Sequence, residues 1–246
     1  MPPPRESVRL SLVGDDSMQW LASALANAYS QQHPNATITV TPANSETGLR
    51  AATDYSGTIG LVSRVVKPSE LEGTRAVVVA RDGIAVIVNR ANPINAITRP
   101  QVTDVFSGKV STWPMGPNAG KIITVVSREA GSGTRDAFEA MAMSGERVTR
   151  TAVVMPGEAA MVDYVAQHPE AIGYCSMAAL TDAVQAMTVD DVALSPQTVE
   201  SQKYPYVRTL AFIVPLASQP ALQDFVDFAL GSDGQRIISQ RLGRAP

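Results

Sequence analysis

Cysteine, histidine and long apolar stretches are scarce in this 246-residue chain, and each scarcity excludes a class of protein. Cys175 is the only cysteine, which excludes an internal disulfide and a cysteine-based zinc site. The two histidines give little support to catalysis or metal binding, so we expect no metal and no cofactor. No apolar run approaches the roughly 18 residues that a membrane span requires. The first residues lack the apolar core of a signal peptide, so localisation cannot be read directly.

The composition is that of a globular protein. Hydrophobic residues make up 45% of the chain and charged residues 17%. The net charge of −3 excludes a broad nucleic-acid surface, and any bound anion must be held by local donors. A chain of this length forms either one large domain or two lobes.

Short apolar runs alternate with stretches whose apolar residues recur at helical spacing. The runs that we expect to form strands are 8–13, 38–40, 58–62, 76–80, 84–89, 122–126, 171–174 and 210–214. Residues 81–83 are expected to separate two of these strands, and residues 181–203 to form an irregular loop. The alternation predicts an α/β protein with mainly parallel sheets, in which ligands bind at the carboxyl ends of the strands.

The turn at residues 128–134, with the sequence REAGSGT, is the most informative segment. Its two glycines allow a ligand to approach the main chain closely. Its hydroxyl groups and the first amides of the following helix would donate hydrogen bonds to a tetrahedral oxyanion. Arg128 would add a planar, permanently charged fork. The turn is therefore interpreted as an anion cradle.

A simpler interpretation is a capped strand-to-helix junction. Its Ser and Thr would then only satisfy the helix start, with Arg128 on a solvated rim. Similar Ser/Gly turns at residues 14–17 and 45–48 follow the first two predicted strands. Three weak signals thus fall at the same edge of the predicted sheet, which favours the cradle.

In their order and spacing, these turns and several further segments resemble the phosphate-binding proteins of bacterial ABC importers, which have the type II periplasmic-binding-protein fold. The resemblance runs almost from end to end of the chain. Its segments are residues 14–17, 45–48, 59–64, 81–89, 92–93, 105–109 with Trp113, 128–134 with Phe138, 171–174, 204–205 and 234–235.

The resemblance implies two lobes joined by a two-stranded hinge, with the anion enclosed between them. Lobe one would comprise residues 5–90 plus 204–246, and lobe two residues 91–203. Residues 81–83 and 204–205 would lie near the two crossings. It further implies high-affinity binding of inorganic phosphate by a monomer, and delivery to an ABC permease in the membrane. The protein would be periplasmic, or extracellular and membrane-anchored, with a signal sequence that is not present in this chain.

The resemblance implies anion contacts at Ser45, Arg128, Ser132, Gly133 and Thr134, with Asp16 or Ser17 added from the first turn. Ser63 and Arg64, at the end of the third predicted strand, are further candidate ligands, although some relatives have an aspartate at the position of Arg64. Asp16 would accept the proton of monohydrogen phosphate and so reject sulfate; alternatively, Asp15 and Asp16 only cap the first helix. Arg64 would contact the anion or form a salt bridge with an acid such as Asp16 or Asp82.

Two alternatives to phosphate transport remain. The same fold could serve as a sensory or surface anion-binding module, or bind another tetrahedral oxyanion. An enzyme is not expected, because Ala130 replaces the first glycine of a G-x-S-x-G nucleophile elbow and no histidine is placed to activate Ser132.

Overall fold

A computed structural model describes residues 8–246, so the predicted beginning of lobe one at residue 5 lies outside the described residues. The helices are α1 (Gln19–Gln32), α2 (Ser45–Asp54), α3 (Arg99–Ser107), α4 (Gly133–Ala142), α5 (Glu158–Gln167), α6 (Pro196–Glu200), α7 (Pro220–Leu230) and α8 (Ser232–Ile238). Short 3-10 segments are η1 (Asp16–Met18), η2 (Pro68–Glu70) and η3 (Met177–Ala179). The strands are β1 (Val8–Asp15), β2 (Ala36–Ala43), β3 (Thr58–Val62), β4 (Thr74–Asn89), β5 (Ala96–Ile97), β6 (Thr124–Arg128), β7 (Val153–Met155), β8 (Ala171–Ser176), β9 (Val184–Ala186), β10 (Thr188–Val189), β11 (Val207–Pro215) and β12 (Gly243–Arg244).

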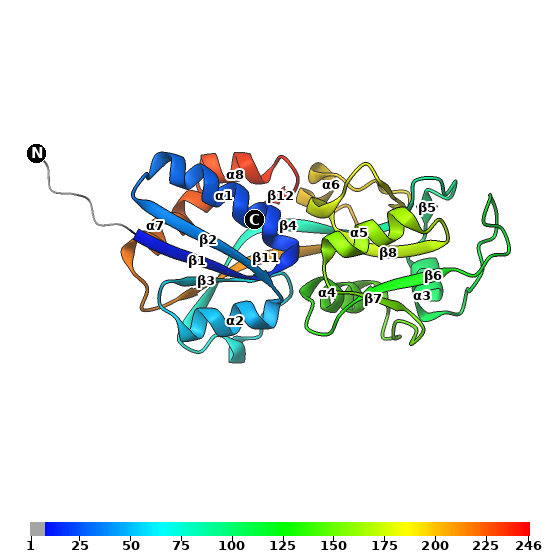
Figure 1. The fold of residues 1–246 in the computed structure, drawn as a ribbon, viewed down its shortest axis with the longest axis horizontal. Coiled ribbons are helices and arrows are strands. Elements are labelled where there is room, and N and C mark those ends of the chain that lie inside the picture. Colours follow the sequence, from blue (N-terminus) through cyan, green and yellow to red (C-terminus); the bar gives the residue numbers. More distant parts are fainter. Residues whose placement is uncertain (1–7) are drawn as a thin grey trace, which may run out of the picture.

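The molecule consists of two α/β lobes side by side, so the predicted two-lobed fold is confirmed (Figure 1). The main sheet runs in the order β2-β1-β3-β11-β4-β8-β6-β7. Pairing is parallel in the outer part of each lobe, at β2-β1-β3 and at β8-β6-β7. It is antiparallel around β4 and β11. The sheet is therefore mixed, with parallel strands where the ends of β1, β3 and β6 face the junction.

Strand β4 crosses from one lobe to the other as one continuous strand of 16 residues. The prediction that residues 81–83 interrupt it was wrong, because this segment pairs with β11 and Asp82 is fully buried. At Ile84 the partner changes to β8 of lobe two. A Cβ atom at Gly83 would lie 2.3 Å from Leu194 Cδ1 and 2.8 Å from Val199 Cγ2, so the α6 region packs closely against this glycine. Since residues 84–89 pair within lobe two, we propose to move the first lobe boundary from residue 90 to Gly83.

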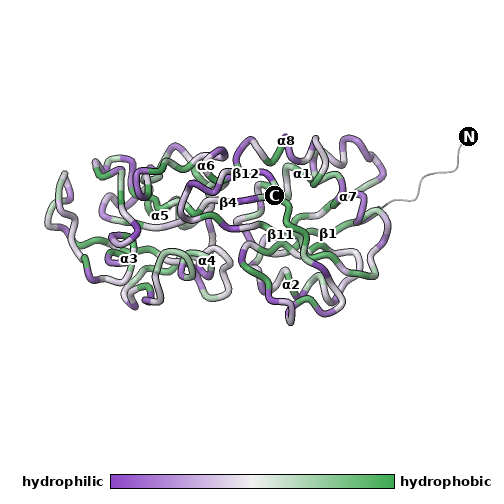
Figure 2. The backbone as a smooth tube through the Cα atoms, turned by 180° about the vertical axis from the view of Figure 1, so that it is seen from behind, coloured by the Kyte–Doolittle hydropathy of each residue, from purple (hydrophilic) through white to green (hydrophobic). Residues whose placement is uncertain are grey.

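Helices cover both faces of the sheet in each lobe. In lobe one, α1 and α7 pack on one face around Leu21 and Phe225, and α2 packs on the other around Leu49. In lobe two, α5 covers one face through Met161, while α3 and α4 cover the other. Residues of β4 alternate between these faces, as a strand buried on both sides requires. The hydrophobic segments of the chain accordingly follow the strands in Figure 2.

Two predicted segments differ from the structure. Strand β6 begins at Thr124, and Ile122 is 73% exposed, because the chain before it belongs to a surface loop rather than to the sheet. Residues 181–203 contain β9, β10 and α6, since β9 pairs with β4 and α6 is capped by Ser195. In the part of the chain that the structure describes, no helix has the length and apolar character to cross a membrane.

Candidate functional site

The carboxylate of Asp15, at the end of β1, is the meeting point of groups from both lobes. Its Oδ2 accepts hydrogen bonds from Ser45 Oγ at 2.8 Å and from the Gly133 amide at 2.9 Å. Its Oδ1 accepts from the hydroxyl and the amide of Ser17 at 2.6 and 3.2 Å. Ser45 belongs to lobe one and Gly133 to lobe two. Donors from two helix starts therefore converge on one carboxylate between the lobes.

Local sequence signals explain why these donors are available. The first amides of a helix have no intrahelical partner, and the caps occupy only one of them in each helix: Asn44 accepts from the Thr47 amide of α2 and Ser132 from the Arg135 amide of α4. The Gly133 amide therefore remains available to Asp15. Gly133 permits the close approach: a Cβ atom there would lie 2.3 Å from the hydroxyl oxygens of both Ser45 and Ser63. The glycine therefore allows the α4 start to touch lobe one.

A buried ion pair borders the same point at the lobe crossing. Arg208 of β11 donates from Nε to Asp82 Oδ2 at 2.9 Å, and from Nη1 to the carbonyl and hydroxyl oxygens of Ser63. The Ser63 amide in turn donates to Ser45 Oγ at 3.1 Å. Nη2 of Arg208 lies 2.8 Å from Asp82 Oδ2 but makes no hydrogen bond of acceptable angle within the described residues. One donor of this buried guanidinium thus remains unsatisfied.

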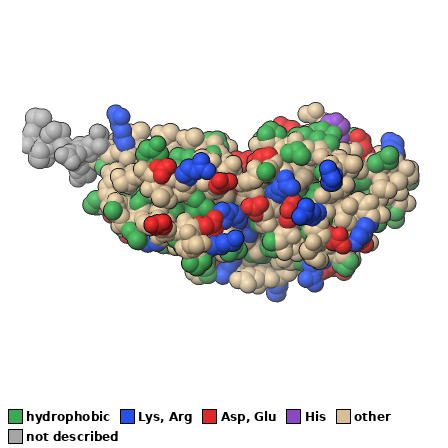
Figure 3. All heavy atoms as spheres, turned by 90° about the horizontal axis from the view of Figure 1, so that it is seen from below, with side chains coloured by type: hydrophobic (Ala, Val, Ile, Leu, Met, Phe, Trp, Pro, Cys, Tyr) green, Lys and Arg blue, Asp and Glu red, His purple; other side chains and the backbone are tan. Residues whose placement is uncertain are grey.

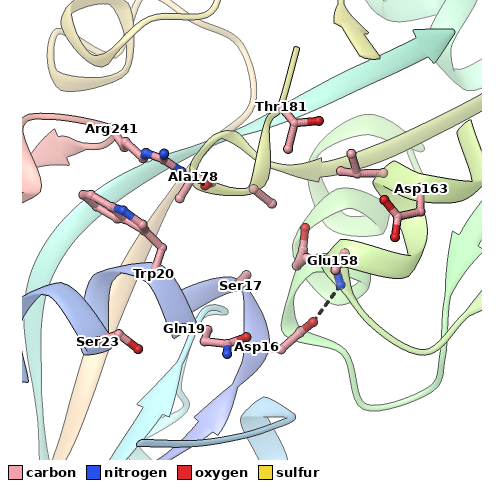
Figure 4. A pocket seen from close by; sticks show the side chains of 13 residues that line it. Asp16, Ser17, Gln19, Trp20, Ser23, Glu158, Asp163, Ala178, Thr181 and Arg241 are labelled. Carbon is pink, nitrogen blue, oxygen red and sulfur yellow. Dashed lines mark hydrogen bonds between the residues drawn. The ribbon is translucent and has the colours of Figure 1, made fainter. Parts of the chain in front are cut away.

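The guanidinium of Arg128, at the end of β6, is 1% exposed and contacts three carboxylates. It donates to Asp16 at 2.8 Å, to Glu158 at 2.6 Å and to Glu129 at 2.9 and 3.0 Å. Asp16 belongs to lobe one, and its Oδ2 also accepts from the Glu158 amide at 2.7 Å, the contact drawn in Figure 4. This second set of bonds also joins the two lobes.

Glu158 is the first residue of α5 and contacts two of the predicted anion ligands. Its Oε1 accepts from Arg128 and, at 2.6 Å, from Thr134 Oγ1. Its Oε2 accepts from the Ser176 amide at 2.8 Å. The side chain is buried, so this carboxylate takes bonds that a ligand oxygen could otherwise receive.

Burial and neighbouring charges shift the carboxylates in opposite directions. Burial raises the pKa of Asp15, but the Arg208 charge and the hydrogen bonds from Ser17, Ser45 and Gly133 outweigh it, and the net pKa is lowered. Burial raises the pKa of Glu158 to about 7 despite the Arg128 charge, with Asp16 adding to the rise. Burial likewise raises the pKa of Asp16 against Arg128. Asp15 therefore stays ionised, while Glu158 titrates near neutrality.

The site combines an excess of acids with strong donors. Four carboxylates lie here: Asp15, Asp82 and Glu158 are buried, and the side chain of Asp16 is 17% exposed. Only two buried guanidiniums in the described part of the chain, those of Arg128 and Arg208, balance their charge. Figure 3 shows acidic and basic side chains side by side over the junction of the lobes. Among residues 8–246, no group of three or more His, Cys, Asp or Glu side chains is arranged to hold a metal.

The structure brings most of the predicted site residues together. They lie at one point between the lobes: Asp16, Ser17, Ser45, Ser63, Arg128, Ser132, Gly133 and Thr134. Ser132 contributes as the cap of α4, through a bond from the Arg135 amide. Arg64 is not among them, because its guanidinium pairs with Glu70 at 2.7 Å and lies 3.7 Å from Asp136.

Four charged residues of the cluster were not among the predicted ligands: Asp15, Asp82, Glu158 and Arg208. Asp15 carried a signal, since it stands in the Gly/Ser turn after β1, but it was interpreted only as a cap. That role is also present, because Asp15 caps η1 through the Ser17 amide. Asp82 and Arg208 are 126 positions apart, and no local pattern indicates such a pair.

A groove of about 410 Å³ between the lobes adjoins the Arg128 cluster. In Figure 4, Trp20 and Arg241 face each other on one side, and Glu158 and Asp163 of α5 lie on the other. The guanidinium of Arg241 lies 5.4 Å from the Trp20 ring, a cation–π contact. The groove gives solvent a route to Asp16, Ser17 and Glu158.

Two α/β lobes joined by crossing strands, with helix starts from both lobes aimed at one point, define the class of two-lobed periplasmic binding proteins. The model of the family described as "PBP superfamily domain" matches residues 2–233, and the chain belongs to this family.

Individual relatives agree with this assignment. The chain is similar to a candidate phosphate ABC transporter substrate-binding protein from Clostridium perfringens, solved with bound phosphate: TM-score 0.90, 31% identity, and coverage of 97% of this chain and 100% of that one. It is 39% identical to phosphate-binding protein PstS 2 of Streptococcus pneumoniae over 107 residues, which are 44% of this chain and only 37% of that protein. It is 27% identical to phosphate-binding protein PstS of Bacillus subtilis over 98% of this chain and 82% of that protein.

Proposed function

We propose that this protein is a binding protein, and not an enzyme, that captures inorganic phosphate between its lobes and presents it to an ABC permease. The observation that carries the proposal is the carboxylate of Asp15, which already receives hydrogen bonds from Ser45 of one lobe and Gly133 of the other. The donors converge on an oxygen anion, which is the geometry that a phosphate oxygen requires. The phosphate-binding relatives support the choice of this anion.

The proposed ligands are Ser17, Ser45, Ser63, Arg128, Ser132, Gly133 and Thr134. A phosphate dianion that leaves water must recover its hydration energy through several charge-assisted bonds, each contributing roughly 1.5–3 kcal/mol. Micromolar affinity needs about 8 kcal/mol, so four or five such bonds suffice. Closure of the lobes supplies these bonds from both sides at once, which couples binding to the closed form.

Asp15 is better placed than Asp16 to accept the proton of monohydrogen phosphate. Asp15 lies where donors of both lobes converge and its pKa is lowered, so it stays ionised, whereas the pKa of Asp16 is raised by burial and its carboxylate pairs with Arg128. An ionised acceptor bonds to P–OH but repels sulfate, which carries no proton. We therefore propose that Asp15 provides the discrimination.

Calorimetric titration of the wild type, Asp15→Asn and Asp16→Asn with phosphate and sulfate tests both proposals. The wild type should bind phosphate at least about 100-fold more tightly than sulfate, a difference of roughly 2.7 kcal/mol. Asp15→Asn should lose most of this discrimination, and Asp16→Asn should keep it. A wild type that ignores phosphate while binding molybdate or tungstate would refute phosphate as the ligand.

Delivery to a permease, a monomeric state and a periplasmic or membrane-anchored extracellular location belong to the same proposal. Delivery is supported by relatives named for phosphate ABC transport. Stimulation of a phosphate permease reconstituted in vesicles by the loaded protein tests delivery directly.

A further inference from the structure

Glu158 competes directly with the proposed ligand. One of its oxygens, Oε1, holds both Arg128 Nη1 and Thr134 Oγ1 at 2.6 Å. These are the charged donor and one of the hydroxyl donors that we propose for phosphate. While Glu158 is ionised, the two groups already have a carboxylate partner, and an oxyanion must displace it.

The surroundings of Glu158 oppose a further negative charge. The groups that face it are Asp16 from η1, Arg128 from β6, Thr134 from α4, Cys175 and Ser176 from β8, and Arg208 from β11. Arg128 is shared with Asp16 and Glu129 as well. Arg208 is shared with Asp82. A phosphate dianion would therefore enter a cluster in which carboxylates already outnumber guanidiniums, and Coulomb repulsion in a buried site favours neutralisation of one of them.

We propose that phosphate binding is coupled to the uptake of one proton by Glu158. Protonation of this carboxylate frees Arg128 and Thr134 for the ligand. The proton comes from the buffer and binds to Oε1, where it replaces the hydrogen bonds from Arg128 and Thr134, and no other covalent bond is made or broken in the protein. This inference rests on the proposed function, because it concerns the same site.

Two features distinguish Glu158 from the other acids as the site of uptake. It is 4% exposed, and its pKa is raised by burial to about 7, so that one proton binds without a large free-energy cost. Asp15, by contrast, has a lowered pKa and remains charged. The groove beside α5 lies against Glu158 and Asp16, which gives a proton access from solvent.

The test is calorimetric titration with inorganic phosphate above about pH 8, where free phosphate keeps its doubly charged form, in buffers of different ionisation enthalpy. Wild type should take up about one proton per phosphate, and its affinity should fall about tenfold per pH unit. Glu158→Gln, which mimics the protonated acid, should take up none and bind with little pH dependence. Asp163→Asn, an exposed carboxylate on the same helix, should behave as wild type.

The outcomes separate the two proposals. Absence of phosphate binding by the wild type at every pH refutes the proposed function. Tight binding with equal proton uptake in the wild type and in Glu158→Gln refutes only the role of Glu158, as does uptake that disappears in Asp16→Asn but not in Glu158→Gln.

A second measurement uses only the wild type, so it tests the inference even if Glu158→Gln does not fold. Infrared difference spectra recorded on addition of phosphate should show a new protonated carboxyl band, shifted by deuterium exchange. No such band while phosphate binds would overturn the inference.

Discussion

At the scale of single residues, Asp82 and Arg208 form a buried ion pair at the crossing between the two lobes. Asp82 is fully buried and the side chain of Arg208 is 4% exposed. The pair lies at the point where β4 leaves lobe one. Asp82 also accepts bonds from the hydroxyl of Ser176 and the amide of Met177 in lobe two. The pair therefore links Ser63 of lobe one, which Arg208 contacts, to Ser176 and Met177 of lobe two, which Asp82 contacts.

Removal of this buried charge should strongly destabilise the protein. Asp82→Asn removes the direct ion-pair partner of the buried Arg208, and breaking such a pair costs about 3–5 kcal/mol. We expect a loss of roughly 3 kcal/mol in the free energy of unfolding, measured by urea denaturation, because the amide retains some hydrogen bonds. Glu146→Gln is the control: it breaks an exposed pair with Lys109, and solvent-exposed pairs contribute little to stability, so its effect should be far smaller. Equal effects of the two variants would show that burial of the Asp82 pair contributes nothing.

At the scale of elements, the sequence predicted what local chemistry determines. Thr98 and Gln101, three residues apart in the sequence T-R-P-Q, form a capping box at the start of α3, and Gly108 ends that helix in the left-handed conformation. The cap of α4 by Ser132 is equally local. Ser45 and the 131–134 turn meet for a different reason than a shared sheet edge: β6 runs opposite to β1 and β3, so the carboxyl ends of the two sets of strands face each other across the junction of the lobes.

What the sequence could not show depends on tertiary contacts. The partners of Arg128 and Glu158 include Asp16, which is 112 and 142 positions away, and no sequence spacing relates them. Arg64 follows β3, which leads to the site, but its guanidinium forms a bidentate salt bridge with the nearby Glu70 instead. Continuity of β4 through residues 81–83 likewise results from pairing with β11, which overrides the local turn signal of Asp82 and Gly83.

The start of α4 provides a prediction at the scale of this element. In Gly133→Ala, the new methyl group would meet the hydroxyl oxygens of Ser45 and Ser63 at 2.3 Å and Asp15 Oδ2 at 2.7 Å. Helix α4 itself should form normally, because alanine favours helix. We expect phosphate affinity to fall at least about 100-fold, because the methyl group separates the lobe-two donors from those of lobe one.

Gly57→Ala is the matched control for that change. Its new methyl group would lie 3.0 Å from the end of the flexible Gln219 side chain and at an ordinary contact distance of 3.9 Å from the Arg9 carbonyl oxygen, in a loop of lobe one. Phosphate titration of both variants should therefore show whether a loss of affinity is specific to the contact at Gly133 or is a general effect of replacing glycine by alanine. Wild-type affinity in Gly133→Ala would show that the α4 start does not touch the ligand.

At the scale of the whole molecule, the buried acids predict how stability depends on pH. The folded-state pKa of Glu158 is about 7 against an ordinary value of 4.5, so the folded protein binds more protons than the unfolded chain between these values. Stability should therefore fall as the pH rises through this window, by roughly 3 kcal/mol from Glu158 alone. Raised pKa values of Asp16 and Asp82 act in the same direction.

The lowered pKa values of Asp15 and of Glu70, the latter to about 2, act in the opposite direction at acidic pH, since their contribution is lost as the pH falls. The phosphate-free protein should therefore be most stable near about pH 5 and less stable at pH 7.5. Chemical denaturation at a series of fixed pH values measures this profile, and Glu158→Gln should remove most of the decline above pH 5. A wild-type stability that rises from pH 5 to 7.5 would mean that the Arg128 guanidinium outweighs burial in holding Glu158 ionised.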